Sequence, residues 1–321
     1  MPPFTGGMFV TLFDSGYKTR ILLYMSFLVY FFVFMFGAII GSFLNVVILR
    51  FNTGVGKQGR SHCLSCAVSL AWYDLVPVAS FFVLGRRCRS CRGLISSQYP
   101  IVEISTAVLF LLTYLSIIVR VEGFAGHPVL FAFSSIPALA WFNLLFFFAV
   151  WCLLMVIVVY DIRHTIIPDV FVYALAMLAL VRLALFAFIQ HTTGSALLSF
   201  VLSGPLLALP FFLIWYFSRG RAMGFGDVKL ALPIGWIFGI SQSITIFVLS
   251  FWIGAIVGIG LLVRSMMYAY LHKRKKHLSR GSARVTMKSE VPFAPFLILA
   301  MVLVFFFHLD FSAISMFLYQ L

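Results

Sequence analysis

Long stretches without a charged residue constrain this chain more than any other feature of its sequence. Between Arg20 and Arg50 lie 29 consecutive residues free of Asp, Glu, Lys and Arg, whereas about 20 apolar residues suffice to cross a bilayer. Similar stretches cover residues 123–160 and 230–263. A backbone inside a bilayer must satisfy its own hydrogen bonds, which favours helices. The sequence therefore predicts an all-α polytopic membrane protein.

Composition excludes several other classes of protein. Hydrophobic residues make up 63% of the chain and charged residues 10%, against about 45–50% and about 25% in soluble domains. A disordered chain, a small secreted disulfide protein and an ordinary soluble enzyme are excluded on these grounds. The net charge of +14 would suggest nucleic-acid binding in a soluble protein. In so apolar a chain it instead indicates basic cytoplasmic loops, so we expect the lipid bilayer as a partner and no nucleic acid.

Proline, glycine and charge positions divide the chain into about eight transmembrane helices. Residues 1–20 are expected to form an exterior N-terminal segment, 21–49 the first helix, 50–99 a cytoplasmic loop domain and 100–321 the remaining transmembrane domain. In that domain the helices are expected at about 100–119, 138–160, 168–190, 195–217, 230–238, 244–263 and 293–311. The stretch 230–263 is too long for one crossing, so a break is expected near 239–243.

The distribution of basic residues predicts the orientation of the helices. If residues 50–99 face the cytoplasm, alternation along eight helices places all but four of the 23 basic residues on the same side. The exceptions are Lys18, Arg20, Arg120 and Arg182. Because cytoplasmic loops carry an excess of Lys and Arg, we expect both termini outside.

Four cysteines in residues 50–99 are spaced like the ligands of a metal ion. Cys63-x2-Cys66 and Cys88-x2-Cys91 are separated by 21 residues. Two such pairs can present four thiolates to one tetrahedral zinc ion, and a site with four protein ligands is structural rather than catalytic. Two disulfides are the rival interpretation, but they require an oxidising compartment. The cytoplasmic placement therefore favours a small zinc module with four cysteine ligands between the first two helices.

Four acidic residues lie beside or within the predicted helices, where carboxylates are expensive and often functional. Glu103 and Asp169 each follow a proline and are expected in the first turn of a helix, where the helix dipole stabilises a negative charge. Asp161 is expected at the C-terminal end of its helix, where the dipole is unfavourable and another group must stabilise it. Asp227 follows Gly224-Phe-Gly226, in which glycines allow close backbone approach.

Asp161 and Asp227 are expected at the same depth, at the cytoplasmic ends of their helices. Two neighbouring carboxylates can share a proton, so that one acts as a general base while the other donates, as in aspartic proteases. Spacing alone does not bring the two helices together. A proton or cation pathway through the same acids stays open at this point.

Taken together, the motifs resemble those of the type IV prepilin peptidases. Gly41-Ser-Phe-Leu-Asn-Val-Val47, the two cysteine pairs and Tyr99-Pro-Ile-Val-Glu103 occur in the family's order. Asp161-Ile-Arg-His-Thr-Ile-Ile-Pro-Asp169 and Gly224-Phe-Gly-Asp-Val-Lys-Leu230 follow. The resemblance extends from about residue 37 to residue 232, and the C-terminal third resembles the family only in hydropathy.

This resemblance implies a GxGD-type intramembrane aspartic protease in which Asp161 and Asp227 are the catalytic pair. It implies that the substrates are prepilins and pseudopilins of type IV pili or type II secretion, cut after the Gly that ends a short basic leader. Members with the cysteine module often also methylate the new N-terminal amine with S-adenosylmethionine. The motif residues that would support substrate or catalyst are Gly224, Gly226, Asp169, Lys229 and Glu103.

Two other functions compete with this enzyme. An ion-coupled transporter could use the same buried acids, but it would need further polar residues near the middle of the bilayer. The sequence offers few, chiefly Asn143 and Arg182. A membrane scaffold carrying zinc is the second alternative, in which replacing either aspartate would change nothing measurable.

Overall fold

The structure is a computed structural model that describes residues 7–52, 61–119, 137–189, 194–272 and 292–310. Helices form almost all the regular structure of these residues, and the only extended pairing among them is two isolated β-bridges, His62 with Ser69 and Arg87 with Leu94. The expected all-α fold is confirmed. The chain forms two compact units, Met1–Met155 and Val156–Leu321, which divide within one helix.

Eight helices of 14 or more residues follow one another along the described chain. They are α1 (Gly7–Arg50), α3 (Gln98–Tyr114), α5 (Ala138–His164), α6 (Asp169–Ile189), α7 (Ser195–Ser218), α8 (Phe225–Phe238), α9 (Ile240–His272) and α10 (Ala294–Phe307). Three short elements are the 3-10 helix η1 (Trp72–Leu75), α2 (Ala79–Val83) and the π-helical turn η2 (Leu115–Val119). Six of the eight are long and apolar enough to span a membrane, whereas α8 and α10 have 14 residues each. The expected number of eight crossings therefore holds only approximately.

Two helix boundaries test the sequence prediction. The expected break in residues 230–263 lies at Gly239, whose φ of +78° suits glycine and separates α8 from α9. The first helix, by contrast, begins at Gly7 rather than at residue 21. The helix is expected to begin after the charged residues at positions 14–20. Charged residues do not break a helix, and residues 7–20 contain no proline that would do so.

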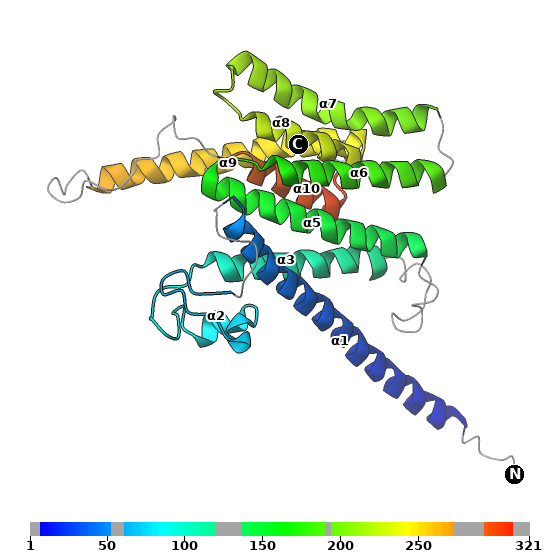
Figure 1. Ribbon diagram of the computed structural model, residues 1–321. Helices are drawn as coiled ribbons and strands as arrows, with labels where there is room; N and C mark the ends of the chain where they lie inside the picture. The colour runs from blue at the N-terminus through cyan, green and yellow to red at the C-terminus, as the bar shows by residue number, and fades with distance from the viewer. Residues whose placement is uncertain (1–6, 53–60, 120–136, 190–193, 273–291, 311–321) are drawn as a thin grey trace, which may run out of the picture. The chain divides into compact units, whose positions relative to one another are not determined.

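In the first unit α1 packs closely against α3 (Figure 1). A Cβ atom at Gly37 or Gly41 would lie 2.7 Å from a Cα atom of α3. Small residues at helix contacts let two backbones approach, which favours association in lipid. The buried Asn45 amide donates a hydrogen bond of 3.1 Å to the carbonyl of Tyr99, and so joins the end of α1 to the start of α3.

The first part of α5 packs on α3 through large side chains. Trp151, which is 1% exposed, donates a hydrogen bond of 2.8 Å from Nε1 to Oγ1 of Thr113. The Phe110 and Phe148 rings stack with centroids 3.9 Å apart. A buried indole N–H requires such a partner, and the pair fixes the register of α5 on α3.

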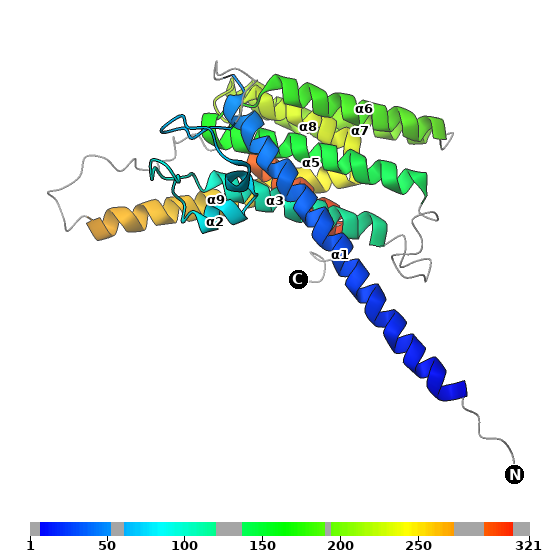
Figure 2. The ribbon, with the colours of Figure 1, turned by 60° about the horizontal axis from the view of Figure 1, so that its bottom comes forward.

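In the second unit α6 and α7 both pack against α8 (Figures 1 and 2). A Cβ atom at Gly235 would lie 2.5 Å from the carbonyl oxygen of Ser203, so only glycine permits the approach of α7 and α8. The Ser203 hydroxyl donates a hydrogen bond of 2.8 Å to the carbonyl of Gly235. From α6, the Arg182 guanidinium donates one of 2.8 Å to the carbonyl of Ile237. These contacts fix α8, which carries Asp227 near its start.

Candidate active site and metal centre

Asp161 lies in the last turn of α5, in the second compact unit. Its side chain is buried, with the residue 4% exposed. The carboxylate accepts a hydrogen bond from the backbone of Ala294, the first residue of α10. The sequence predicts that some other group must offset the unfavourable dipole of its own helix, and the positive N-terminal end of α10 does so. The Oδ2 atom has no hydrogen-bond partner among the described residues.

Asp227 lies in the first turn of α8, in the same compact unit. The residue is 6% exposed, and its carboxylate accepts a hydrogen bond from the backbone of Gly224. Its Oδ1 atom has no partner among the described residues. Asp227 and Asp161 are close enough to interact electrostatically. The second unit thus brings the two aspartates together, which sequence spacing alone could not establish.

The free oxygen on each carboxylate is unusual, because buried polar atoms nearly always have a hydrogen-bond partner. Three buried side-chain atoms lack one among the described residues, namely Asp161 Oδ2, Asp227 Oδ1 and Ser243 Oγ. Two of the three belong to the aspartate pair. An arrangement in which each carboxylate keeps one oxygen available can bind a water molecule or a polar substrate atom.

The two glycines before Asp227 have different surroundings. A Cβ atom at Gly226 would lie 3.0 Å from Cβ of Ile167, which belongs to the connection between α5 and α6. At Gly224 the nearest atom would be Oδ2 of Asp227, at an ordinary 3.7 Å. Close approach therefore favours glycine at position 226, where α8 contacts the segment that follows Asp161. At position 224 there is room for a side chain.

Asp169 and Lys229 form an ion pair beside this site. Asp169 lies in the first turn of α6, as expected. The Lys229 ammonium lies 2.8 Å and 3.0 Å from its two carboxylate oxygens, and 5.4 Å from the centre of the Phe225 ring. The pair links the first turns of α6 and α8, so it supports the position of Asp227.

Glu103 lies in the first unit, and the prediction that it lies in the first turn of its helix is wrong. Because α3 begins at Gln98, Glu103 is not in the first turn, and the helix dipole does not explain its presence. The residue is 6% exposed and accepts a hydrogen bond of 2.6 Å from the backbone N–H of Val78. Ser42 of α1 also donates to it. Glu103 thus joins α1 and α3 to the loop that contains the cysteines.

The four cysteines gather at one point in residues 61–97, here called the cysteine module. The Sγ atoms of Cys63, Cys66, Cys88 and Cys91 all lie within 4.8 Å of one another, close enough to hold one metal ion. The β-bridges His62–Ser69 and Arg87–Leu94 close the two knuckles that present them.

Backbone hydrogen bonds to the cysteine thiols favour their ionised form, which is the form that binds a metal cation. Hydrogen bonds from the backbone of Cys66 and of Ser65 lower the pKa of Cys63 to about 6. The backbone of Gly93 lowers the pKa of Cys91, but the neighbouring thiols outweigh it and raise that pKa to about 11. Four thiols this close cannot all ionise without a positive charge between them, so metal binding would release protons.

Sequence reasoning missed the partner of Asp161. Ala294 is fully buried and follows Pro292-Phe293 in a part of the chain where only hydropathy resembles the family. A proline at the start of α10 is a helix-start signal that the sequence does contain. Nothing in the spacing, however, relates this helix start to an aspartate more than 130 residues earlier.

Comparisons with known proteins agree with the motifs. The family model described as the bacterial peptidase A24 N-terminal domain matches residues 35–117, and that of the type IV leader peptidase family matches residues 146–259. The first match includes α3 and the cysteine module, and the second includes both aspartates. No solved structure matches the chain.

Several curated relatives resemble the chain over most of their length. A prepilin leader peptidase/N-methyltransferase of Vibrio cholerae is 26% identical over 84% of this chain and 92% of the relative. A protein of the same name from Pseudomonas aeruginosa is 25% identical over 82% and 85%. A type 4 prepilin-like proteins leader peptide-processing enzyme of Escherichia coli O78:H11 is 30% identical over 63% and 74%. The chain therefore belongs to the type IV leader peptidase family.

Proposed function

We propose that this protein is a membrane-embedded aspartic endopeptidase that cleaves the short basic leader of type IV prepilins and pseudopilins. Asp161 and Asp227 are its catalytic residues. One observation carries the assignment: two buried carboxylates interact with each other while each keeps an oxygen without a partner among the described residues. The names of the relatives, which are leader peptidases for prepilins, supply the substrate class.

The chemistry needs one proton shared between the two carboxylates. The ionised carboxylate accepts a proton from a water molecule, whose oxygen attacks the carbonyl carbon of the scissile bond. The protonated carboxyl donates its proton to the carbonyl oxygen. The tetrahedral intermediate then collapses and the C–N bond breaks. The carboxyl that took up the water proton donates it to the leaving nitrogen, and the other carboxylate takes a proton from a hydroxyl of the intermediate, which restores the shared proton. Like charges in close contact disfavour double ionisation, which keeps one proton on the pair.

The surroundings of the pair support this role. The N-terminal end of α10 stabilises negative charge on Asp161, and the first turn of α8 does the same for Asp227. The contact of Gly226 with Ile167 and the Lys229–Asp169 ion pair support α8 beside the connection that follows α5. These four residues are positioning residues and do not react.

The site is proposed to face the cytoplasm from the bacterial inner membrane. All but four of the 23 basic residues fall on one side when the helices alternate, and cytoplasmic loops carry such an excess. A basic leader that stays in the cytoplasm and an apolar helix in the bilayer would bring the scissile bond to the membrane surface, where both aspartates are expected.

The cysteine module is proposed to hold one structural zinc ion. Four thiol ligands in two Cys-x2-Cys knuckles suit tetrahedral zinc and leave no open position for catalysis. Bound zinc would stabilise the folded loops, because binding of a structural zinc ion is coupled to local folding.

A second activity, N-methylation of the new N-terminal residue, is proposed from the names of the relatives. The freed amine would attack the methyl carbon of S-adenosylmethionine, the C–S bond would break, and S-adenosylhomocysteine would leave as a proton is lost. No residue is assigned to this cofactor.

The transporter alternative is not favoured. The polar residues that such a pathway would need are already engaged locally. The Asn143 amide donates to the carbonyl of Leu139 in its own helix, at 2.9 Å, and Arg182 donates to the carbonyl of Ile237. The family model that matches residues 146–259 is also that of a peptidase family and not of a transporter family. The scaffold alternative is not favoured either, because it does not explain two buried aspartates, whose burial costs free energy.

The test is cleavage of a prepilin by the purified, reconstituted protein, with mass spectrometry of the products. Cleavage after the Gly that ends the leader is expected from the wild type, and a gain of one methyl group is expected when S-adenosylmethionine is added. Asp161→Asn and Asp227→Asn should each abolish cleavage while the protein still inserts. Asp169→Asn is the comparison variant, since that carboxylate is half exposed and only positions α8, so it should lose activity a few-fold at most.

A further inference from the structure

We propose that one surface of the cysteine module rests on the lipid bilayer at the level of the phospholipid headgroups. This surface, here called the η1–α2 surface, consists of Trp72 and Tyr73 from η1 and of Phe82 and Val83 from α2. The occupant is the membrane in which the protein is embedded. The proposal does not depend on the catalytic assignment of the two aspartates.

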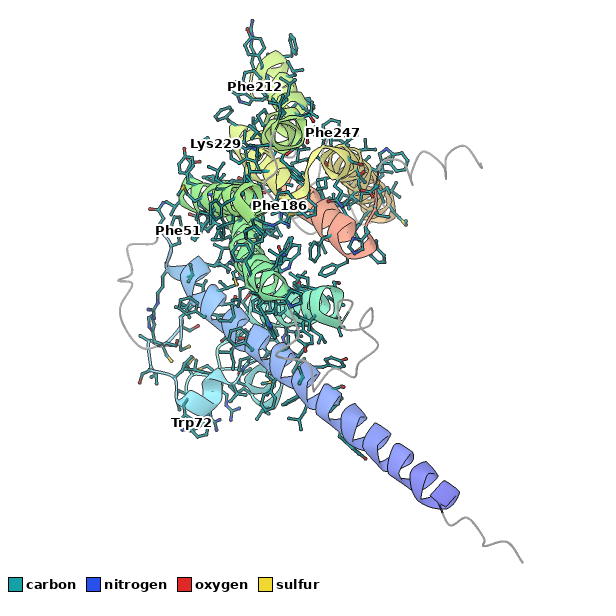
Figure 3. All side chains as sticks on the ribbon, turned by 90° about the vertical axis from the view of Figure 1, so that its right-hand side faces the viewer. Phe51, Trp72, Phe186, Phe212, Lys229 and Phe247 are labelled. Atoms are coloured by element: carbon teal, nitrogen blue, oxygen red, sulfur yellow. The ribbon has the colours of Figure 1, made fainter. Side chains whose placement is uncertain are left out.

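The η1–α2 surface is unusually apolar for a part of the chain outside the membrane spans. Trp72 is 77% exposed, Tyr73 49%, Phe82 67% and Val83 82%, and η1 and α2 contact each other. Trp72 lies at the outer edge of the module (Figure 3). The neighbouring Phe81 is 9% exposed and already supplies the module's own core. Folding of the module therefore does not account for the four exposed side chains.

The connections of the module bring it to the membrane surface. It follows α1, which ends at Arg50, and precedes α3, which begins at Gln98, and both helices are candidate membrane spans. The part of the module that contains α2 lies beside one end of α3 (Figure 1). Because α3 begins at Gln98, directly after the module, the end of the module lies close to the headgroups.

Hydrogen bonds further restrict the module. The Val78 N–H, between η1 and α2, donates to the buried Glu103 carboxylate of α3 at 2.6 Å. The Arg86 guanidinium donates to the Ser97 hydroxyl at 3.1 Å, just before α3 begins. Because the segment joining η1 to α2 is thus fixed to a membrane span, the η1–α2 surface cannot move far from the bilayer.

The chemistry of the surface and its rim fits a phospholipid interface. Trp and Tyr are enriched at the level of the headgroups, where their rings are partly buried and their polar atoms stay wet. The module carries four exposed arginines and a single acidic residue, Asp74. Arg86 lies over the Phe81 ring at 5.7 Å. Arg89 lies over the Tyr73 ring at 5.1 Å and is paired with Asp74 at 2.8 Å, so Arg86, Arg87 and Arg92 supply the net positive charge. Guanidinium groups next to aromatic rings can bind lipid phosphates while the rings contact the acyl chains.

Fluorescence quenching by brominated lipid tests the proposal on the full chain. The protein is reconstituted into nanodiscs of phosphatidylcholine and phosphatidylglycerol, with or without bromine on the upper acyl chain. The chain has six tryptophans, so the emission of Trp72 is taken as the difference between the wild type and Trp72→Phe. This difference is expected to be blue-shifted relative to water-exposed tryptophan and largely lost with brominated lipid.

Two further variants localise the contact. Phe82→Ser combined with Val83→Ser should restore much of the Trp72 emission in brominated lipid, because the surface loses its apolar contacts. Leu64→Ser is the matched control: Leu64 is 71% exposed but lies in the first knuckle, and its replacement should leave quenching unchanged. Metal content per chain, measured on each variant, establishes that the module is still folded.

Three results would overturn the proposal. The first is a Trp72 emission that is red-shifted and insensitive to brominated lipid. The second is a loss of quenching with Leu64→Ser equal to that with the double variant. The third is a Trp72 emission that is the same with and without brominated lipid but changes when a prepilin is added. The η1–α2 surface would then be a protein-binding surface.

Discussion

The contact of Gly226 with Ile167 allows a sharp prediction about catalysis. In Gly226→Ala the new methyl carbon would lie 3.0 Å from Cβ of Ile167 and 3.2 Å and 3.3 Å from its Cδ1 and Cγ1 atoms. These distances are shorter than an ordinary van der Waals contact of about 3.5–4.0 Å. Ile167 and the first turn of α8 must therefore separate by a few tenths of an ångström.

The expected effect on stability is small. Overpacking costs about 1–3 kcal/mol, whereas replacing glycine by alanine within a helix gains about 1 kcal/mol. The net destabilisation should therefore be about 0–2 kcal/mol, and the protein should still insert. The effect on catalysis should be larger, because a displacement of about 1 Å between catalytic groups can reduce the rate about 100-fold. Since the shift here is only a few tenths of an ångström, we expect kcat to fall up to about 10-fold.

The assay is the rate of prepilin cleavage at saturating substrate, with thermal unfolding measured on the same preparations. Gly224→Ala is the first control, because its methyl group would meet nothing closer than 3.7 Å. Gly258→Ala in α9 is the second, because no atom lies within 4 Å of that position. Both should stay within about threefold of the wild type. Equal losses in Gly224→Ala and Gly226→Ala would refute the reasoning, since they would point to the sequence motif rather than to the contact.

Three other perturbations have expected outcomes. Lys229→Met removes the ion pair with Asp169, which is partly exposed and should contribute only about 0.2–1 kcal/mol. Cleavage should fall a few-fold, less than in Gly226→Ala, and a complete loss would assign Lys229 to the chemistry. Cys63→Ser should abolish the binding of one zinc ion per chain, seen by metal analysis, and unfold the cysteine module while helix content by circular dichroism stays. If the wild-type protein, purified under reducing conditions, contained no zinc, the zinc assignment would be contradicted. Glu103→Leu leaves the N–H of Val78 unpaired, at a cost of about 1–3 kcal/mol. Hydrogen exchange should become faster in the module, and unchanged exchange would exclude the linking role of Glu103.

Much of the fold could be predicted because membrane spans follow local rules. Charge-free stretches and prolines locate helices without knowledge of the tertiary structure, and the break at Gly239 follows from the length that one crossing allows. The metal cluster was predictable for the same reason, since each Cys-x2-Cys pair is a local unit. The start of α1 was not predictable. Charged residues indicate where a helix leaves the bilayer, but the helix itself can continue beyond that point, as α1 does.

The candidate site was harder to predict because its contacts join distant segments. The sequence indicates that Asp161 needs a stabilising group, but Ala294 provides it from another helix. It treats Gly224 and Gly226 alike, although only the second contacts Ile167. It places Glu103 at a helix start, whereas its partner is the N–H of Val78 in the preceding loop. In each case the deciding contact depends on how helices and loops pack, which spacing does not encode.

The measurement that tests the central claim most directly is a double-mutant comparison of cleavage. Asp161→Asn, Asp227→Asn and the double variant would be assayed beside the wild type with one prepilin under single-turnover conditions. Residues that act as a unit are strongly non-additive. We predict that each single variant loses at least about 1,000-fold in rate, and that the double variant is no slower than the singles. Substantial cleavage by either single variant, or losses that multiply in the double variant, would contradict catalysis by this pair.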